Sequence, residues 1–318
     1  MRLASLPGQP YPLIQEEADQ VKAVFTHKLG SIYDDLPEER YHFPATYRRQ
    51  VEEAVGDFIV YYEPRRGGSE NDGYRGRQAY VATARVVDIR PDPQRPDHFY
   101  AAIQDYIPFP NPVPFREGGQ YRERFLVRAD GATSKGAFGR AVRALPEVEY
   151  EAIVAAGFGA DLLIAGAPAE PGYRGLEEPP ALFQRPVVEQ LTNRLFRDRV
   201  FAKSVQTAYA ETCAFTDLRI VNGGGRTEAE AAHIRPVAAQ GPDSVRNGIA
   251  LSGTVHWMFD RGLVSIAPDH SILVARSGVP EAALRWFRPD RRIRLPCDPR
   301  QWPHPAFLEW HRQQVFKG

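Results

Sequence analysis

Runs of hydrophobic positions bounded by polar ones predict strands in the first half of the chain. GDFIVYYEPRR contains a run of β-branched and aromatic residues from Phe58 to Tyr62, which is typical of a strand. QAYVATARVVDIR, residues 78–90, predicts a second strand that pairs with the first across a loop of Gly, Ser, Asn and Asp. Residues 100–115 begin like a strand, but their prolines are expected to prevent helix and ladder alike. RFLVRA, residues 124–129, predicts a further short strand.

Helical spacing of apolar residues occurs in two longer segments. PEVEYEAIVAAG, residues 146–157, has one apolar face and a glycine that is expected to end the helix. VVEQLTNRLFRDRVFAKSVQTAY, residues 187–209, predicts one long helix. The apolar face of this helix is expected to carry Val188, Leu191, Leu195 and Phe196.

A change in composition divides the chain into two domains of the α+β class. Residues 166–186 are rich in Gly, Pro and Glu and are interpreted as a linker. An N-terminal domain is therefore expected over residues 1–165 and a C-terminal domain over residues 187–318. Each has enough residues to bury a core of its own.

Composition excludes several classes of protein. No apolar run approaches the roughly 20 residues that a membrane-spanning helix needs, so no membrane partner is expected. The N-terminus lacks a long apolar stretch with a small-residue cleavage site, which argues against a secretory signal. Two isolated cysteines, Cys213 and Cys297, cannot form a disulfide framework. A reducing, cytoplasmic location is the simplest expectation.

The charges leave the binding partner open. The net charge is zero, so there is no global electrostatic mark of a nucleic-acid-binding protein. Of the 40 basic residues only five are lysines, and the guanidinium fork of arginine suits phosphates and guanine edges. A codon bias toward arginine explains the same ratio equally well.

Three polar residues in the second half lie in short motifs with regular spacing. EAAHIRP places His233 at the end of a predicted strand, and NGIALS places Asn247 14 residues later, after a loop containing Gly and Pro. His256 follows 9 residues further on, in a helix expected to begin at Ser252 or Thr254. The pattern predicts two strands and a helix that surround a small metal site.

These motifs resemble the HNH endonucleases, in particular their restriction-enzyme branch. The resemblance covers about residues 205–270, and the ending FLEWHRQQVF is also similar to such proteins. It implies a ββα-metal fold and hydrolysis of DNA phosphodiester bonds with one divalent cation, such as Mg²⁺, Mn²⁺, Co²⁺ or Ni²⁺. A homodimer that cuts both strands is compatible with it, although no interface motif is present.

Each motif residue receives an expected role from this resemblance. His233 is the candidate base that takes a proton from water. His256 is the candidate metal ligand, with Asp260 four residues later on the same helix face. Asn247 either ligates the metal weakly or holds the region of His233 by hydrogen bonds.

The sequence departs from the HNH pattern at Ala232. Many HNH enzymes have a His or Asp ligand immediately before the catalytic histidine, and Glu230 is the candidate substitute here. A structural zinc is not expected, because no C-x-x-C pair accompanies Cys213. Taken singly, each motif residue also has a purely structural explanation. A lone histidine is usually a packing residue, Asn247-Gly248 is usually a turn, and Asp260 and Glu230 can be surface charges.

The first half resembles the opening strands of PUA-like domains, the superfamily that includes EVE, ASCH and SRA readers. The similarity lies in GDFIVYY followed by YVATARV, over about residues 40–150. Such readers bind modified bases, often flipped out of the duplex. The resemblance therefore implies an N-terminal β-barrel with helices that recognises a modified base, such as a modified cytosine, in double-stranded DNA.

A flipped base needs aromatic faces and polar groups at its edge. The candidates for this base pocket are Tyr61, Tyr62, Tyr74, Asp105 and Tyr106. The candidates for phosphate contacts are Arg65, Arg66, Arg75 and Arg77. Strand alternation alone would turn Tyr61 or Tyr62 toward the core, and a solvated hairpin tip accounts equally well for the arginines.

The whole sequence thus predicts a two-domain, modification-dependent HNH restriction endonuclease. Two alternatives stay open at this point. One is an HNH nuclease whose first half recognises ordinary sequence or RNA. The other is a nucleic-acid-binding protein with a degenerate nuclease fold, which Ala232 makes conceivable.

Overall fold

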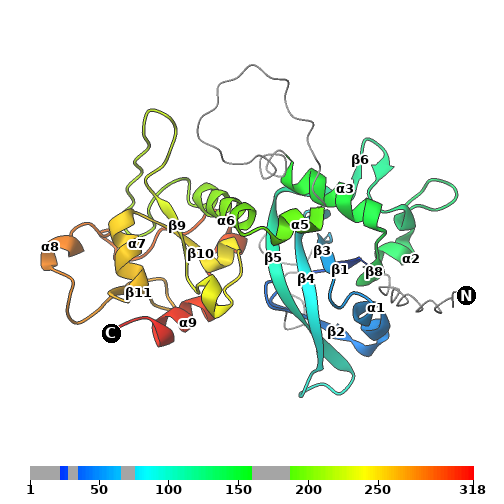
Figure 1. The fold of residues 1–318 in the computed structure, drawn as a ribbon, viewed down its shortest axis with the longest axis horizontal. Helices are drawn as coiled ribbons and strands as arrows, with labels where there is room; N and C mark the ends of the chain where they lie inside the picture. The colour runs from blue at the N-terminus through cyan, green and yellow to red at the C-terminus, as the bar shows by residue number, and fades with distance from the viewer. Residues whose placement is uncertain (1–21, 28–34, 66–75, 160–186) are drawn as a thin grey trace, which may run out of the picture.

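A computed structural model describes residues 22–27, 35–65, 76–159 and 187–318 (Figure 1). The expected linker, 166–186, lies outside these residues. Within them, every helix is too short or too polar to cross a membrane. The chain has a mixed α+β architecture, with a curled half-barrel sheet in its first half and a smaller β-hairpin and helix unit in its second.

Six strands form the sheet of the first half, in the order β2-β5-β4-β3-β1-β8. Strands β1 and β3 are parallel, and the other neighbours are antiparallel. The strands are β1 (Ala23–Thr26), β2 (Arg40–Pro44), β3 (Phe58–Glu63), β4 (Ala79–Pro91), β5 (His98–Pro114) and β8 (Val142–Ala144). The β4–β5 ladder contains three register shifts, and such bulges bend a sheet.

Short elements and helices accompany this sheet. They are η1 (Ala45–Tyr47), α1 (Arg48–Glu52), β6 (Arg116–Glu117), β7 (Gln120–Tyr121), η2 (Arg124–Leu126), α2 (Lys135–Phe138) and α3 (Glu147–Phe158). Helix α3 packs on one face of the sheet with Tyr150, Ile153 and Val154. Val51 and Ala54, from the region of α1, pack with the opposite face.

The strand pairing of 58–62 with 78–90 is confirmed, whereas the expectation for the proline-rich stretch is wrong. Strand β5 continues to Pro114 and pairs with β4 both up to Pro108 and again at Val113 and Pro114, with a register shift between them. Its last prolines recur at every second residue, so their missing N–H groups lie on one edge and the other edge can still pair. Residues 124–129 are also not a strand, because η2 occupies their start and only Val127 forms an isolated bridge, with Thr133.

The helix expected over 146–157 is confirmed, but the glycine that ends it is Gly159. Gly159 has φ +53, a conformation that glycine adopts without strain. Gly157 lies inside the helix, where a Cβ atom would meet the ring of Phe109 at 2.5 Å. Gly157 therefore allows close packing against Phe109, and Gly159 ends the helix.

The long helix expected over 187–209 is two helices, α5 (Val187–Thr192) and α6 (Arg194–Ala208). Asn193 separates them, because its side-chain oxygen accepts hydrogen bonds from the N–H groups at the start of α6. The break also turns Leu195 out of the expected apolar face, and its side chain is exposed.

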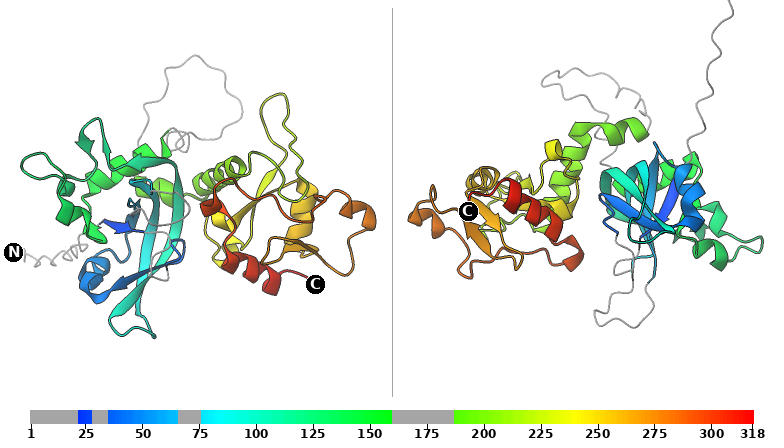
Figure 2. Two further views of the ribbon diagram at one scale, coloured as in Figure 1. Left: turned by 180° about the vertical axis from the view of Figure 1, so that it is seen from behind. Right: turned by 90° about the horizontal axis from the view of Figure 1, so that it is seen from below.

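Helix α6 belongs to both halves of the molecule. Phe196 and Val200 pack in the core of the first half, together with Leu191 of α5. Phe201 and Val205 pack in the core of the second half. The two cores therefore do not divide at residue 187, and Figures 1 and 2 show α6 between the sheet and the second half.

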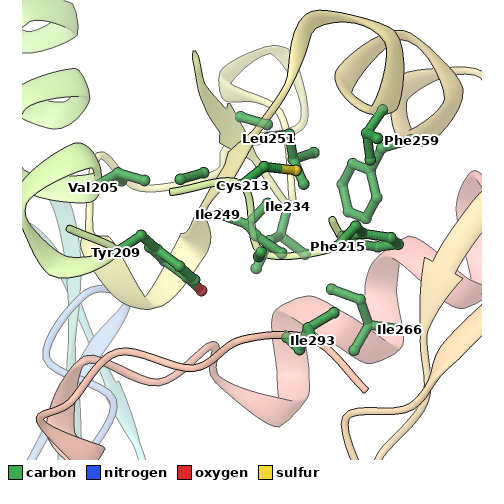
Figure 3. Close-up of a cluster of buried hydrophobic side chains, with 14 of the residues drawn as sticks. Val205, Tyr209, Cys213, Phe215, Ile234, Ile249, Leu251, Phe259, Ile266 and Ile293 are labelled. Atoms are coloured by element: carbon green, nitrogen blue, oxygen red, sulfur yellow. The ribbon is translucent and has the colours of Figure 1, made fainter. Parts of the chain in front are cut away.

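The second half is built around a hairpin and the helix that follows it. Its elements are β9 (Glu230–His233), η3 (Val237–Ala239), η4 (Val245–Asn247), β10 (Gly248–Leu251), α7 (Gly253–Asp260), β11 (Val264–Ile266), β12 (Ile272–Val274), α8 (Glu281–Leu284), η5 (Pro299–Gln301) and α9 (Pro305–Gln314). Figure 3 shows the apolar cluster beneath them, which includes Val205, Ile234, Ile249 and Phe259.

Gly248, the glycine of the Asn-Gly motif, allows α6 to approach β10. A Cβ atom at Gly248 would lie 2.3 Å from Val205 Cγ2 and 3.0 Å from the ring of Phe201. We expect Gly248→Ala to lower the free energy of unfolding by about 1–3 kcal/mol, since overpacking forces the helix or the hairpin to shift. Urea titration followed by circular dichroism measures this effect.

The control for this substitution is Gly223→Ala. A Cβ atom at Gly223 would meet nothing within 4 Å, so this variant should unfold at the same urea concentration as the wild type. Equal midpoints for Gly248→Ala and Gly223→Ala would show that the close approach of α6 is not needed.

Candidate active site

The β9–β10 hairpin and α7 bring the motif residues together. His233 ends β9 and pairs with Gly248 at the start of β10, so the two motifs EAAHIRP and NGIALS are neighbours in the ladder. Helix α7 begins after Ser252, as expected, and carries His256 and Asp260. The N–H group of Gly253 donates to the carboxylate of Glu228 at 2.9 Å, which favours the helix start electrostatically.

The ring of His233 is held on one face and at one nitrogen. Phe201 stacks on it, with ring centroids 3.7 Å apart and planes inclined by 10°. Its Nε2 lies 2.9 Å from Oδ1 of Asp243. These contacts leave Nδ1 to face other groups, and 17% of the side chain is exposed. His233 is therefore oriented rather than merely packed.

Asp243 is a site residue that the sequence analysis missed. Its carboxylate is fully buried, and Arg197 Nε contacts it at 2.8 Å, with Arg194 at 3.3 Å. Burial alone would raise the pKa of Asp243, but the hydrogen bond with His233 and the charges of the two arginines outweigh burial and lower it. An ionised Asp243 accepts a hydrogen bond from Nε2–H, which selects the His233 tautomer with Nδ1 free to act as a base.

His256 lies between two carboxylates. Its Nδ1 is 2.7 Å from Oε2 of Glu230, and its Nε2 is 3.6 Å from Oδ2 of Asp260. Both acidic side chains are largely exposed. Glu230 and Ala232 lie on the same face of β9, because strand side chains alternate. Glu230 thus contacts His256 of α7 from β9, the strand in which Ala232 departs from the HNH pattern.

An open pocket of about 420 Å³ joins the two histidines. Its lining includes His233 of β9 together with His256 and Asp260 of α7. His311 of α9 also lines it, but burial lowers the pKa of His311 to about 4. Its Nδ1 lies 2.8 Å from Ser265 Oγ, so His311 is a neutral, hydrogen-bonded wall residue.

Asn247 lies away from this pocket, with its side chain fully buried. Its Oδ1 accepts from the N–H of Arg235, and its Nδ2 donates to the carbonyl oxygens of Arg235 and Pro242, each at 2.9 Å. Both ends of the amide are thus committed to the backbone that follows β9. This geometry fits the second of its two expected roles, which is to hold the region of His233.

The donors around His256 fit a divalent cation. An imidazole nitrogen with carboxylate oxygens suits Mg²⁺, Mn²⁺, Co²⁺ or Ni²⁺. Over the described ranges, no three His, Cys, Asp or Glu side chains are already gathered as a metal site. Ligation would therefore require a small rotation of exposed Asp260 toward Nε2, and its exposure permits that rotation.

The tyrosine candidates of the first half divide into buried and accessible residues. Tyr61 and Tyr62 are each 1% exposed and belong to the clusters on opposite faces of β3, as strand alternation requires. The hydroxyl of Tyr61 is buried and has no hydrogen-bond partner within the described residues. Tyr106 lines a pocket of about 360 Å³, and Tyr74 lies outside the described residues.

The other candidates of the first half are charged residues. Asp105 contacts Arg85 and Arg197 and is therefore not a free acceptor. Arg77 lines the pocket with Tyr106 and lies 3.7 Å from Glu63 and 3.6 Å from Asp298. Arg65 is exposed, and Arg66 and Arg75 lie outside the described residues.

Comparison with known proteins identifies the second half. Residues 213–267 match the family described as HNH endonuclease. This segment includes β9, β10 and α7, so it contains both histidines of the pocket. The protein therefore contains an HNH endonuclease domain, the class of enzyme that hydrolyses phosphodiester bonds.

Two solved structures show weaker similarity over longer stretches. A modification-dependent TagI restriction endonuclease has 16% identity and a TM-score of 0.29, covering 92% of this chain and 81% of its own. The Type IV phosphorothioation-dependent restriction endonuclease ScoMcrA has 14% identity and a TM-score of 0.18, covering 74% and 46%. No curated protein matches the sequence. Because both TM-scores are low, the assignment rests on the family match and the site geometry.

Proposed function

We propose that the protein is a divalent-metal-dependent endonuclease that cleaves double-stranded DNA carrying a modified base. In this proposal residues 187–318 cleave, and residues 1–165 form a PUA-like reader. One observation carries the nuclease part: His233 and His256 open into the same pocket within the segment that matches the HNH family.

His233 acts as the general base. Asp243 and Phe201 fix its ring, so Nδ1 can accept a proton from a water molecule that attacks phosphorus. Nε2–H remains donated to Asp243, and the ionised carboxylate stabilises the imidazolium that forms. The arrangement corresponds to the acid–histidine pairs of other hydrolases, with water as the nucleophile.

His256 and Asp260 would hold the cation, with Nε2 and a carboxylate oxygen as the donors. A divalent cation there would neutralise charge at the phosphate and stabilise the departing 3′ oxygen. Glu230 accepts a hydrogen bond from Nδ1–H, which orients the ring for ligation as carboxylates commonly do behind metal-binding histidines. Glu230 would thus support the ligand His256 instead of replacing the ligand absent at Ala232.

The reader part of the proposal rests on the half-barrel sheet and the pocket that contains Tyr106. This pocket also includes Arg77, His27 and Glu63 of the first half and Arg246 of the second. An aromatic ring and several hydrogen-bonding side chains in a pocket of about 360 Å³ suit a flipped base. Burial raises the pKa of Tyr106, so its hydroxyl stays protonated and can donate.

The proposal is tested by digesting DNAs of identical sequence that differ only in modification. Unmodified, methylated, hydroxymethylated and glucosylated substrates are each incubated with Mg²⁺, Mn²⁺, Co²⁺ or Ni²⁺. Cleavage of at least one modified substrate is expected, while the unmodified DNA stays intact. The His233→Ala protein, prepared in parallel, controls for contaminating nucleases.

The other outcomes of this digest favour other functions. Equal cleavage of modified and unmodified DNA would favour an HNH nuclease that reads ordinary sequence. Cleavage of RNA alone would favour an RNA substrate. Intact nucleic acid under every condition would favour a binding protein with a degenerate nuclease fold.

A further inference from the structure

A continuous row of charged side chains connects the sheet of the first half with His233. Arg85 Nη2 of β4 lies 2.6 Å from Oδ2 of Asp105, whose other oxygen contacts Arg197 of α6. Arg197 Nε then lies 2.8 Å from Asp243, and Asp243 lies 2.9 Å from Nε2 of His233. Opposite charges alternate along the four side chains from Arg85 to Asp243, and His233 ends the row.

The middle of this row is shielded from solvent. The side chains of Arg197 and Asp105 are 13% and 16% exposed, and that of Asp243 is 0% exposed. Burial alone would lower the pKa of Arg197, but the two carboxylates outweigh it and raise the pKa. Hydrogen-bonded charges in such surroundings are strongly coupled, because little water screens them. Removing a charge at one end of the row therefore affects the neighbouring ion pair.

The backbone at Asp105 is built for this contact. Asp105 has φ +51 and lies where the β4–β5 register shifts, between the pairs Arg85–Gln104 and Thr83–Ile107. A bulge of this kind re-aims a side chain out of the regular alternation of the strand. A non-glycine residue in this conformation carries a strain cost, and such strain concentrates at functional positions.

A second set of contacts holds the loop that carries Asp243. Glu38 of the first half accepts hydrogen bonds from Ser244 at 3.0 Å and from Arg246 at 3.2 Å. The neighbouring Glu39 contacts Arg235, which lies two residues after His233 in the same motif. Acidic residues of the first half thus bind both ends of the loop between His233 and Asn247.

We propose that Asp105 is a positioning residue for the nuclease, which acts through Arg197 and Asp243 to hold His233 in its catalytic orientation. This inference rests on the proposed function, in which His233 is the base. With Asp105, Arg197 is anchored between two carboxylates, and Asp243 keeps one oxygen directed at Nε2. Without the charge at Asp105, Arg197 turns fully to Asp243 and competes with His233 for it. The first half of the chain is then part of the catalytic machinery as well as the reader.

Asp105→Asn is the direct test. Asparagine tolerates positive φ as well as aspartate does, so the backbone of the bulge is preserved while the charge is removed. We expect kcat for cleavage of the preferred DNA to fall about 3- to 30-fold with an unchanged KM. Asp88→Asn is the matched control, because Asp88 is an exposed carboxylate that lines the same pocket of about 610 Å³ as Asp105 but pairs with Arg90.

A double variant shows whether the effect passes through Arg197. Arg197→Gln removes the link, so adding Asp105→Asn to it should cause no further loss of kcat. If the two substitutions lowered kcat by independent factors that multiply in the double variant, the proposal would be overturned. An unchanged kcat in Asp105→Asn, or a loss confined to KM, would also overturn it, since a DNA contact moves KM and a positioning residue does not. Melting temperatures identify any variant whose loss reflects unfolding.

A readout without activity separates this inference from the proposed function. Nitrogen NMR of the His233 ring should show the Nε2–H tautomer in the wild type and a mixture of tautomers in Asp105→Asn. The same tautomer in both proteins would overturn the positioning role even if no DNA substrate were found. Conversely, if His233→Ala abolished cleavage and Asp105→Asn left it unchanged, the proposed nuclease function would be supported. Only the positioning role of Asp105 would be overturned.

Discussion

Replacing His233 by alanine is expected to lower the rate of DNA cleavage by about 10²–10⁴-fold, the range in which general acid–base groups contribute. The reason is that Nδ1 is the only nitrogen of this oriented ring left to take a proton from water, because Nε2 is bound to Asp243. Single-turnover cleavage of a labelled modified duplex measures the loss. DNA affinity, measured by gel shift without a divalent cation, should be retained.

The control for this substitution is His270→Asn. His270 lies on the β11–β12 turn with φ +66, a conformation that asparagine adopts readily. It is not among the residues of the active-site pocket, so its variant should cleave at the wild-type rate. A folded His233→Ala protein with wild-type kinetics would remove the basis of the nuclease mechanism.

Replacing His256 by alanine is expected to abolish binding of the catalytic cation and, with it, cleavage. Nε2 of His256 and Asp260 are the proposed ligands, and the remaining single carboxylate is too exposed to hold an ion alone. Glu230→Gln should be milder, about 10- to 100-fold in metal affinity or rate, because it removes the negative charge behind the ligand but keeps an oxygen that can accept from Nδ1–H. Calorimetric titration with Mn²⁺ measures affinity, and a chelator should stop the wild-type reaction.

Glu281→Gln is the matched control for these metal-site variants. Glu281 is an exposed carboxylate in the first turn of α8, away from the residues of the pocket. Its loss should leave Mn²⁺ affinity unchanged. If His256→Ala bound Mn²⁺ as tightly as the wild type, the cation would have to lie elsewhere.

The sequence was most informative where local rules decide the structure. The spacing of EAAHIRP, NGIALS and the helix that carries His256 is fixed by strand pairing and by the helix turn, so the elements that carry His233, His256 and Asp260 could be predicted from it. Alternation along β3 likewise predicted that Tyr61 or Tyr62 faces a core, and both do. The strand pairing of β3 with β4 was predicted from the loop of Gly, Ser, Asn and Asp that separates two strand-like runs.

Predictions from the sequence were wrong where one local pattern of residues is compatible with two structures. Prolines in β5 were read as ladder breakers, although their period of two leaves one edge of the strand able to pair. Residues 187–209 were read as one helix, whereas Asn193 ends the first helix and begins a second one. In both cases the choice depends on a neighbouring strand or turn that the local pattern does not contain.

By itself, the sequence determined the catalytic class and the two histidines that face a common pocket, because adjacent elements with fixed periods carry them. Only the tertiary structure decided what holds those histidines. Asp243 lies in an irregular loop, and Arg197 and Asp105 come from a helix and a bulged strand far away in the chain. Contacts between such distant residues depend on how the two cores pack around α6, and no periodicity along the chain encodes that packing.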